Sequence, residues 1–120
     1  MTLTSVKKGE VEFEFKIGPD HLNRVMSTHG GVICTLVDIA GSIAVASMTG
    51  GPDTGVSTDI SVSFISGSKL NETLIVESKC HKAGRNLAFT TTHLKLKETG
   101  ALVATGSHTK YIGKPPKSKL

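Results

Sequence analysis

Residues 29–48 have the hydrophobic periodicity of one long helix around which the rest of the chain is arranged. The face opposite the apolar row carries Cys34, Asp38, Gly41 and Val45 in place of a row of charges. A helix with almost no charged face is buried on several sides, so we predict that a second protein chain covers what its own sheet leaves bare. The apolar row repeats at i, i+3, i+4 and i+7 and consists of Val32, Ile33, Leu36, Val37, Ala40, Ile43 and Ala44.

Alternation of apolar and polar residues predicts strands on both sides of this helix. Residues 11–17 alternate without interruption, and residues 56–64 alternate again. Residues 73–81, 86–97 and 101–112 are also strand-like and are joined by short turns that contain glycine or asparagine. In the 56–64 strand one face is expected to hold Val56, Thr58, Ile60, Val62 and Phe64.

This order of elements predicts an α+β fold in which one long helix lies on an antiparallel sheet of five to six strands. A helix of 20 residues is about 30 Å long, and a strand of ten residues is about 33 Å long, so the two layers match in length. We expect a single domain over residues 1–113. Residues 114–120 are expected to form a basic, disordered tail.

The charge is distributed unevenly along the chain. Residues 1–60 hold four Lys/Arg and seven Asp/Glu, a balance of −3, whereas residues 61–120 hold ten and three, a balance of +7. The basic half indicates an anionic partner such as a nucleic acid, a membrane or a phosphorylated ligand. The four Phe and one Tyr offer few stacking platforms, and we find no nucleic-acid motif. No run of 18 apolar residues is present, so we expect no membrane-spanning segment.

Asp38 is the clearest chemical candidate in the helix. It is the only Asp, Glu, Lys or Arg between Arg24 and Asp53. A lone carboxylate on such a helix is costly to bury unless a partner or a reaction uses it; the alternative is a surface aspartate bonded to a nearby loop. Gly30 and Gly31 leave the first N–H groups of the helix uncrowded, which suits an anion or a carbonyl oxygen, although they could also be simple loop glycines.

Other residue types give weaker signals. Cys34 and Cys80 have no metal-site or disulfide spacing, and we expect two buried free thiols. We predict no metal site, because the histidines other than His29 have no close partner at ligand spacing and are assigned surface or structural roles. These are His21, His81, His93 and His108.

Six motifs together resemble one enzyme family over residues 10–113. They are His21-x-Asn23, His29-Gly30-Gly31, Leu36-Val37-Asp38, Gly55-Val56-Ser57-x-Asp59, Gly84-Arg85-x-Leu87-Ala88-Phe89-Thr90 and Gly106-x-His108-Thr109-Lys110. With them the chain resembles the hotdog-fold acyl-CoA thioesterases, in the branch of the phenylacetate-pathway thioesterases and animal thioesterase superfamily member 2. The chain departs from the family pattern at Met26, Gly67 and Asn71.

The resemblance implies hydrolysis of medium- to long-chain fatty acyl-CoA in a hotdog fold. It assigns Asp38 as general base or nucleophile, the Gly30 N–H to the thioester carbonyl, Asn23 and Ser57 to orientation, and His29 to the loop. It implies no cofactor, since coenzyme A is part of the substrate. The phosphates suggest Lys69, Lys82, Arg85 and Lys110 as basic contacts. The coenzyme-binding set that the resemblance implies is Phe64, Ser66, Lys69, Lys82, Gly84, Arg85, Asn86 and Tyr111.

Helix geometry adds a constraint on any shared site. Gly30 and Asp38 are eight positions apart, or about 12 Å along one helix, so both cannot reach one carbonyl carbon. We therefore predict composite sites in which Gly30 and Asn23 of one subunit meet Asp38 and Ser57 of another. The resemblance favours a dimer of dimers.

Three other functions stay open from the sequence. One is a hotdog hydratase or dehydratase, although the longer motif of that class is missing after Asp20 and His21. Another is a non-catalytic acyl-CoA-binding or scaffold protein, and the third is a thioesterase for aromatic acyl-CoA. We expect a cytoplasmic location, or a mitochondrial one.

Overall fold

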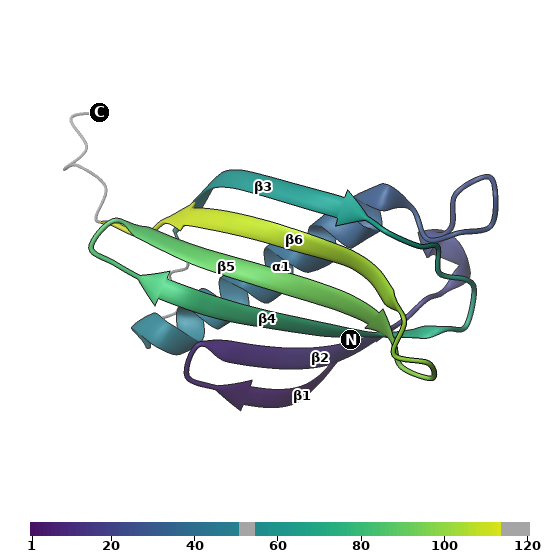
Figure 1. Cartoon of the computed structure of the whole chain (residues 1–120), viewed down its shortest axis with the longest axis horizontal. Helices are drawn as coiled ribbons and strands as arrows, with labels where there is room; N and C mark the ends of the chain where they lie inside the picture. The colour runs from purple at the N-terminus through teal and green to yellow at the C-terminus, as the bar shows by residue number, and fades with distance from the viewer. Residues whose placement is uncertain (51–54, 114–120) are drawn as a thin grey trace.

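The computed structural model describes residues 1–50 and 55–113, and Figure 1 shows its elements as one helix behind a broad sheet. The short 3-10 helix η1 (Pro19–His21) precedes the long helix α1 (Gly30–Thr49). The predicted tail at 114–120 lies outside the described residues. The strands are β1 (Thr2–Lys7), β2 (Glu10–Lys16), β3 (Val56–Phe64), β4 (Thr73–Ala83), β5 (Leu87–Leu96) and β6 (Leu102–Tyr111).

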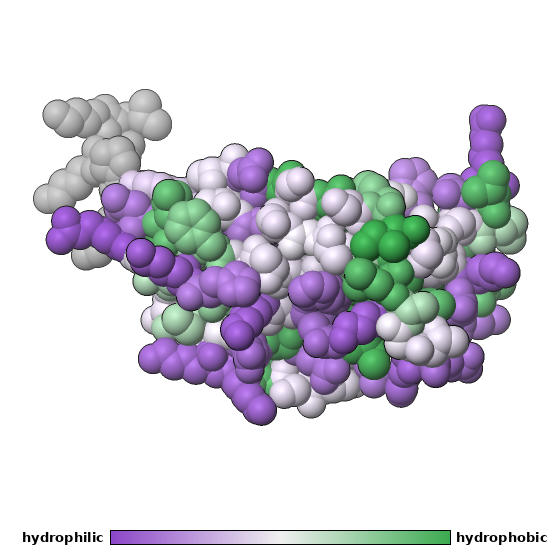
Figure 2. Space-filling view, viewed as in Figure 1, coloured by the Kyte–Doolittle hydropathy of each residue, from purple (hydrophilic) through white to green (hydrophobic). Residues whose placement is uncertain are grey.

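The sheet is antiparallel throughout and has the order β1-β2-β4-β5-β6-β3, so β1 and β3 are its edges. The helix lies across one face (Figure 1), and the predicted α+β hotdog arrangement is confirmed. Figure 2 shows the opposite face, on which hydrophilic and neutral residues predominate. A sheet with one covered face and one solvated face needs the alternation that its strands carry.

Strand β1 is not among the strands that hydrophobic periodicity predicts. The strand contains an irregularity between Leu3 and Ser5, which interrupts the alternation on which the prediction depends. As a result Leu3 and Val6 pair with the buried Phe13 and Val11 on the same face of the sheet. Leu3 and Val6 themselves stay more than half exposed, because β1 lies too far from α1 to be covered by it.

The core fills the space between α1 and the middle strands. The predicted apolar face of β4 is confirmed, since Leu74, Val76 and Cys80 are all buried. Cys34 is only partly buried, in contrast to the expected burial of both thiols. The fully buried large apolar side chains are Phe13, Ile17, Val37, Val45, Leu74, Val76 and Leu94.

The predicted outer face of α1 needs a correction. Gly41 and Val45 are buried, whereas Cys34 and Asp38 lie on the more open side. Gly41 is pressed against the sheet so closely that a Cβ there would lie 2.7 Å from Nδ1 of His108. Besides Cys34 and Asp38, the more open side carries residues that are small or apolar: Thr35, Ile39, Ser42 and Ala46.

By length and hydropathy alone α1 could cross a membrane, with a mean hydropathy of 1.8 over its best window. Its sheet-facing side instead forms the core with residues such as Leu36, Val37 and Ala40. The helix is therefore the core helix of this domain, and its apolar composition reflects coverage on more than one side.

Strand β3 also differs from its prediction. A bulge between Ser57 and Asp59 shifts the register, so that Ser57 pairs with Lys110 and Ile60 pairs with His108. Ser57 therefore joins the helix-side face, where Val56 and Thr58 were expected. Most of the strand is exposed, including Phe64 at 59%, because it is an edge strand that α1 covers poorly.

Candidate active site

The loop before α1 is built around the side chain of Asn23. Its Oδ1 accepts hydrogen bonds from the backbone N–H groups of Val25 and Ser27, at 3.0 and 3.1 Å. This closed turn holds Met26 at a φ of 63°, a left-handed conformation that is uncommon for a residue with a side chain. The side-chain oxygen of Asn23 is therefore structural, whereas its side-chain NH2 group makes no hydrogen bond within residues 1–50 and 55–113.

His29 closes the N-terminus of α1. Its Nδ1 accepts a hydrogen bond from the Gly31 N–H at 3.0 Å, and its carbonyl oxygen accepts one from Val32. The Gly30 N–H has no hydrogen-bond partner among the described residues. The ring of Phe64 lies beside it, 3.5 Å from where a Gly30 Cβ would be. The helix start thus offers a free N–H at the positive end of its dipole.

These residues share one groove of about 380 Å³ at the N-terminal end of α1. It brings together four predicted site residues: Asn23, Gly30, Phe64 and Ser66. The groove holds two kinds of donor, an amide side chain and a helix N–H, but its described lining has no carboxylate. We call this the donor half-site.

Asp38 lies elsewhere, with Ser57 and His108. The Oγ of Ser57 is 2.7 Å from Nε2 of His108, and Oδ1 of Asp38 is 3.7 Å from the same nitrogen. The bulge in β3 is what turns Ser57 toward this cluster. The Asp38 side chain is 50% exposed, whereas that of His108 is fully buried. We call this cluster the base half-site.

His108, which the sequence assigns only a surface or structural role, lies at the centre of the base half-site. Burial lowers its pKa below the usual histidine value, and the nearby Lys110 ammonium acts in the same direction, while Asp38 and Asp59 oppose the shift. The imidazole is therefore neutral near pH 7. Its Nδ1 is buried without a hydrogen-bond partner in the described chain, and Nε2 faces Ser57. Gly106, His108 and Lys110 are alternate residues of β6, and this spacing indicates that all three face the helix.

Lys110, one of the basic residues suggested for the coenzyme phosphates, lies inside the domain next to Asp38. Its side chain is buried against α1, and Nζ donates a hydrogen bond to Ser42 Oγ at 2.7 Å. Ser42 in turn lies 3.5 Å from Oδ1 of Asp38. The cation therefore belongs to the base half-site.

The other predicted coenzyme contacts divide between two ends of the sheet. Phe64, Ser66 and Lys69 lie at the donor half-site, where Lys69 pairs with Ser27. The β4–β5 hairpin lies at the opposite end of the sheet (Figure 1), close to Tyr111, which pairs with Leu87. Exposed residues of this hairpin are Lys82, Gly84, Arg85 and Asn86. The Gly84 N–H donates a hydrogen bond to the Leu87 carbonyl oxygen at 2.8 Å, within the hairpin itself.

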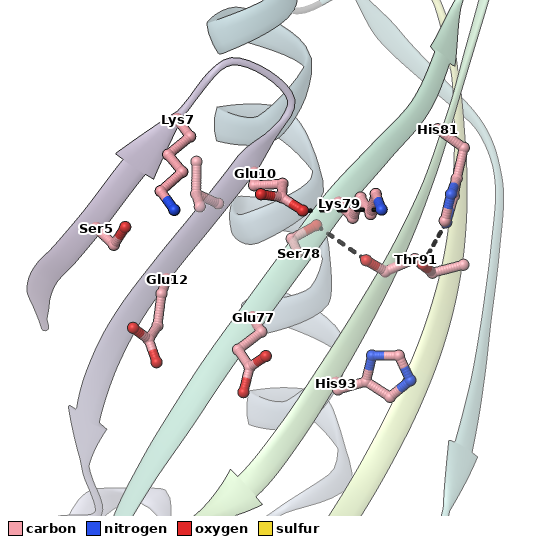
Figure 3. A pocket seen from close by; sticks show the side chains of 11 residues that line it. Ser5, Lys7, Glu10, Glu12, Glu77, Ser78, Lys79, His81, Thr91 and His93 are labelled. Carbon is pink, nitrogen blue, oxygen red and sulfur yellow. Dashed lines mark hydrogen bonds and ion pairs between the residues drawn. The ribbon is translucent and has the colours of Figure 1, made fainter.

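A larger hollow of about 470 Å³ lies on the outer face of the sheet and is shown in Figure 3. It mixes glutamates, lysines and histidines of β1, β2, β4 and β5, among them Glu10 paired with Lys79 at 3.7 Å and His81 bonded to Thr91. None of the predicted site residues lines it. The described residues contain no group of three His, Cys, Asp or Glu side chains suited to a metal ion.

Comparison with known proteins decides the family. The sequence pattern of the thioesterase superfamily matches residues 27–103. The chain belongs to the thioesterase superfamily. This thioesterase is 38% identical to acyl-coenzyme A thioesterase 13 of Homo sapiens over 113 residues, 94% of this chain and 80% of that protein.

Solved structures agree with the fold of this thioesterase. Zebrafish thioesterase superfamily member 2 superimposes with a TM-score of 0.89 at 36% identity, covering 92% of this chain and 80% of that one. A Streptococcus mutans protein bound to acetyl CoA gives a TM-score of 0.85 at 25% identity, over 96% and 90% of the two chains.

Proposed function

We propose that this thioesterase hydrolyses medium- to long-chain fatty acyl-CoA to a free fatty acid and coenzyme A. The observation that carries the proposal is the separation of its chemistry into a donor half-site and a base half-site. The donor half-site suits the thioester carbonyl oxygen, and the base half-site suits an attacking water. Together they meet the needs of acyl transfer to water.

The reaction assigns each group one task. The Gly30 N–H and the Asn23 amide donate to the carbonyl oxygen as negative charge develops on it. Asp38 takes a proton from water, aided by Ser57, while the water oxygen bonds to the carbonyl carbon. The carbon–sulfur bond then breaks, and the coenzyme leaves as a thiolate that takes up a proton. A direct attack by the Asp38 carboxylate is the other possible first step.

We propose that each complete site combines two chains. Gly30 and Asp38 lie about 12 Å apart along α1 by helix rise, and β3 runs back beside the helix from Ser57 to Phe64. Strand β3 is an unpaired edge with exposed Ile60 and Phe64. Antiparallel pairing of two β3 strands around a two-fold axis would bring the Phe64 end of one chain toward the Ser57 end of the other.

The same pairing would reunite the divided coenzyme contacts. It would bring the β4–β5 hairpin of one chain toward the donor half-site of its partner, so that Lys82 and Arg85 could approach the phosphates. From the family resemblance we further propose that two such dimers associate. Sedimentation of the purified protein at micromolar concentration tests both steps, since a stable monomer would exclude a composite site.

The choice of an acyl-CoA substrate rests on relatives, and the preference for a fatty acyl group rests on one apolar hollow. The human relative is named for acyl-coenzyme A, and the S. mutans structure contains acetyl CoA. An apolar hollow of about 400 Å³ beside His29 is lined by Phe15, Val32, Leu36 and Ile39. Such a surface would accept alkyl groups and reject charged acyl groups.

Thiol release from a panel of acyl-CoAs tests the function. The panel contains medium-chain, long-chain and phenylacetyl thioesters, and wild type is compared with Asp38→Asn at equal oligomeric state. We expect the highest kcat/KM for fatty acyl thioesters and a collapse in the variant. Preference for phenylacetyl-CoA would indicate the aromatic branch, and tight binding without turnover would indicate a binding protein. The cytoplasmic or mitochondrial location stays a prediction that cell fractionation can test.

A further inference from the structure

We propose that Ser42 and Lys110 are positioning residues that hold the carboxylate of Asp38 in one orientation. The inference rests on the proposed thioester hydrolysis and adds two groups that act through Asp38 without touching the substrate. Both residues lie outside the predicted catalytic set, one on the open side of α1 and the other on β6. The geometry that joins them is a chain of side-chain hydrogen bonds.

The chain begins at a buried cation. Lys110 is only 4% exposed, because β6 directs it, like Gly106 and His108, toward α1. Its Nζ donates to Ser42 Oγ at 2.7 Å, and Ser42 Oγ lies 3.5 Å from Asp38 Oδ1. Ser42 follows Asp38 by four residues, so the two side chains lie on the same side of the helix.

The chemistry of the three groups fixes the direction of these bonds. An ammonium group can only donate hydrogen bonds, and an ionised carboxylate can only accept them. Ser42 therefore accepts from Lys110 and directs its own hydroxyl proton toward Asp38. The contact between Lys110 and Ser42 carries a charge on the donor, which makes it stronger than a bond between neutral groups.

His108 approaches the same carboxylate oxygen from the other side. Its Nε2 is 3.7 Å from Asp38 Oδ1 and 2.7 Å from Ser57 Oγ. Oδ1 is thus flanked by two groups, whereas Oδ2 has no partner among the described residues. We assign Oδ2 as the oxygen that takes the proton from water, and Oδ1 as the oxygen by which the carboxylate is held.

The charge of Lys110 acts on the other groups of the base half-site, since it contributes to the lowered pKa of His108. This places the ammonium close enough to act on the groups that orient the water. A lysine that only filled the core would be replaceable by an apolar side chain of similar length without loss of turnover. The two roles therefore differ in what substitution does to kcat.

Steady-state kinetics of Ser42→Ala, Ser42→Thr and Lys110→Met test the proposal. We expect kcat to fall about tenfold or more in Ser42→Ala and Lys110→Met, with KM nearly unchanged, because a bond to a charged group is lost away from the substrate. Ser42→Thr keeps the hydroxyl and should retain most of the wild-type kcat. Thermal melting and sedimentation report whether each variant keeps its fold and assembly.

The same substitutions in an Asp38→Asn background separate positioning from a general structural role. If Ser42 and Lys110 act through Asp38, their loss costs little once the carboxylate is gone, and the effects are not additive. Equal fold-losses in both backgrounds, or wild-type kcat in folded Ser42→Ala and Lys110→Met, would overturn the positioning role alone. Absence of turnover by the wild type on every thioester would overturn both this role and the proposed function.

Discussion

The donor half-site and the base half-site are built in different ways. The donor half-site uses a loop and the start of one helix, and its reactive groups are N–H donors that Asn23 and Gly30 present. The base half-site uses side chains from α1, β3 and β6, which meet only when the sheet has formed. The donor groups of the first half-site are therefore local in sequence, whereas the groups of the second are brought together by tertiary contacts.

In both half-sites, different groups hold the structure in place and remain open for chemistry. In the donor half-site the side-chain oxygen of Asn23 holds the loop, while its side-chain nitrogen has no hydrogen-bond partner among the described residues. In the base half-site His108 and Lys110 are buried, while Asp38 at the centre is half exposed. Each half therefore has a fixed part and an open part, and substitutions can separate the two.

The largest effect is expected from removing the base. Asp38→Asn keeps the size of the side chain but cannot accept the water proton, and general-base catalysis contributes roughly 10²- to 10⁴-fold. We expect a loss of kcat in that range, measured by thiol release. Asp20→Asn, an exposed aspartate in η1, is the matched control and should keep the wild-type rate. Equal activity of the two variants would remove Asp38 from the mechanism.

The donor half-site can be divided at one residue. Asn23→Asp keeps the oxygen that closes the loop but loses the N–H donor, and removal of one such donor costs roughly 10²- to 10³-fold in kcat. Asn23→Ala loses both and should also lower the melting temperature. We expect similar kcat losses in the two variants and a melting change only in Asn23→Ala. Wild-type turnover by Asn23→Asp would show that the amide does not contact the carbonyl.

The close approach of α1 to β6 predicts a change in stability. A Cβ at Gly41 would lie 2.7 Å from His108 Nδ1 and 2.8 Å from Thr90 Oγ1. Because both neighbours are buried, Gly41→Ala should lower the free energy of unfolding by about 1–3 kcal/mol. Ala46→Gly, on the more open side of the same helix, gives the glycine–alanine difference in helix propensity for comparison. Denaturant unfolding gives both values, and equal stability would mean that the helix can move away.

The smallest effect is the pH dependence of stability caused by His108. Its pKa is lowered in the folded protein, so as the pH falls below the ordinary value of 6.5 the imidazole is protonated in the unfolded chain before it is protonated in the folded one. Stability contributed by the neutral imidazole is full above pH 6.5 and declines as pH falls toward the folded pKa. We expect the difference in unfolding free energy between wild type and His108→Gln to change across this window. A constant difference would contradict the assignment.

The features that the sequence predicts are those that depend on neighbouring residues, and the features it does not predict depend on strand pairing. The helix, five of the six strands and the glycines at the helix start could be predicted because each depends on local spacing, as in His29-Gly30-Gly31, whereas the role of Asn23 came from the family resemblance. Strand β1 and the orientation of Ser57 could not, because a bulge shifts alternation by one residue and only pairing reveals it. His108 and Lys110 join the base half-site through cross-strand register, which the sequence of one strand does not contain.

The central claim is that each site combines the donor half-site of one chain with the base half-site of another. Mixing the subunits of Asp38→Asn and Asn23→Asp by joint refolding tests it directly. In a mixed dimer one composite site receives both defects and the other receives none, so thiol release should return to about a quarter of the wild-type rate after random mixing. A mixture no more active than its two parents would mean that each site lies within one chain.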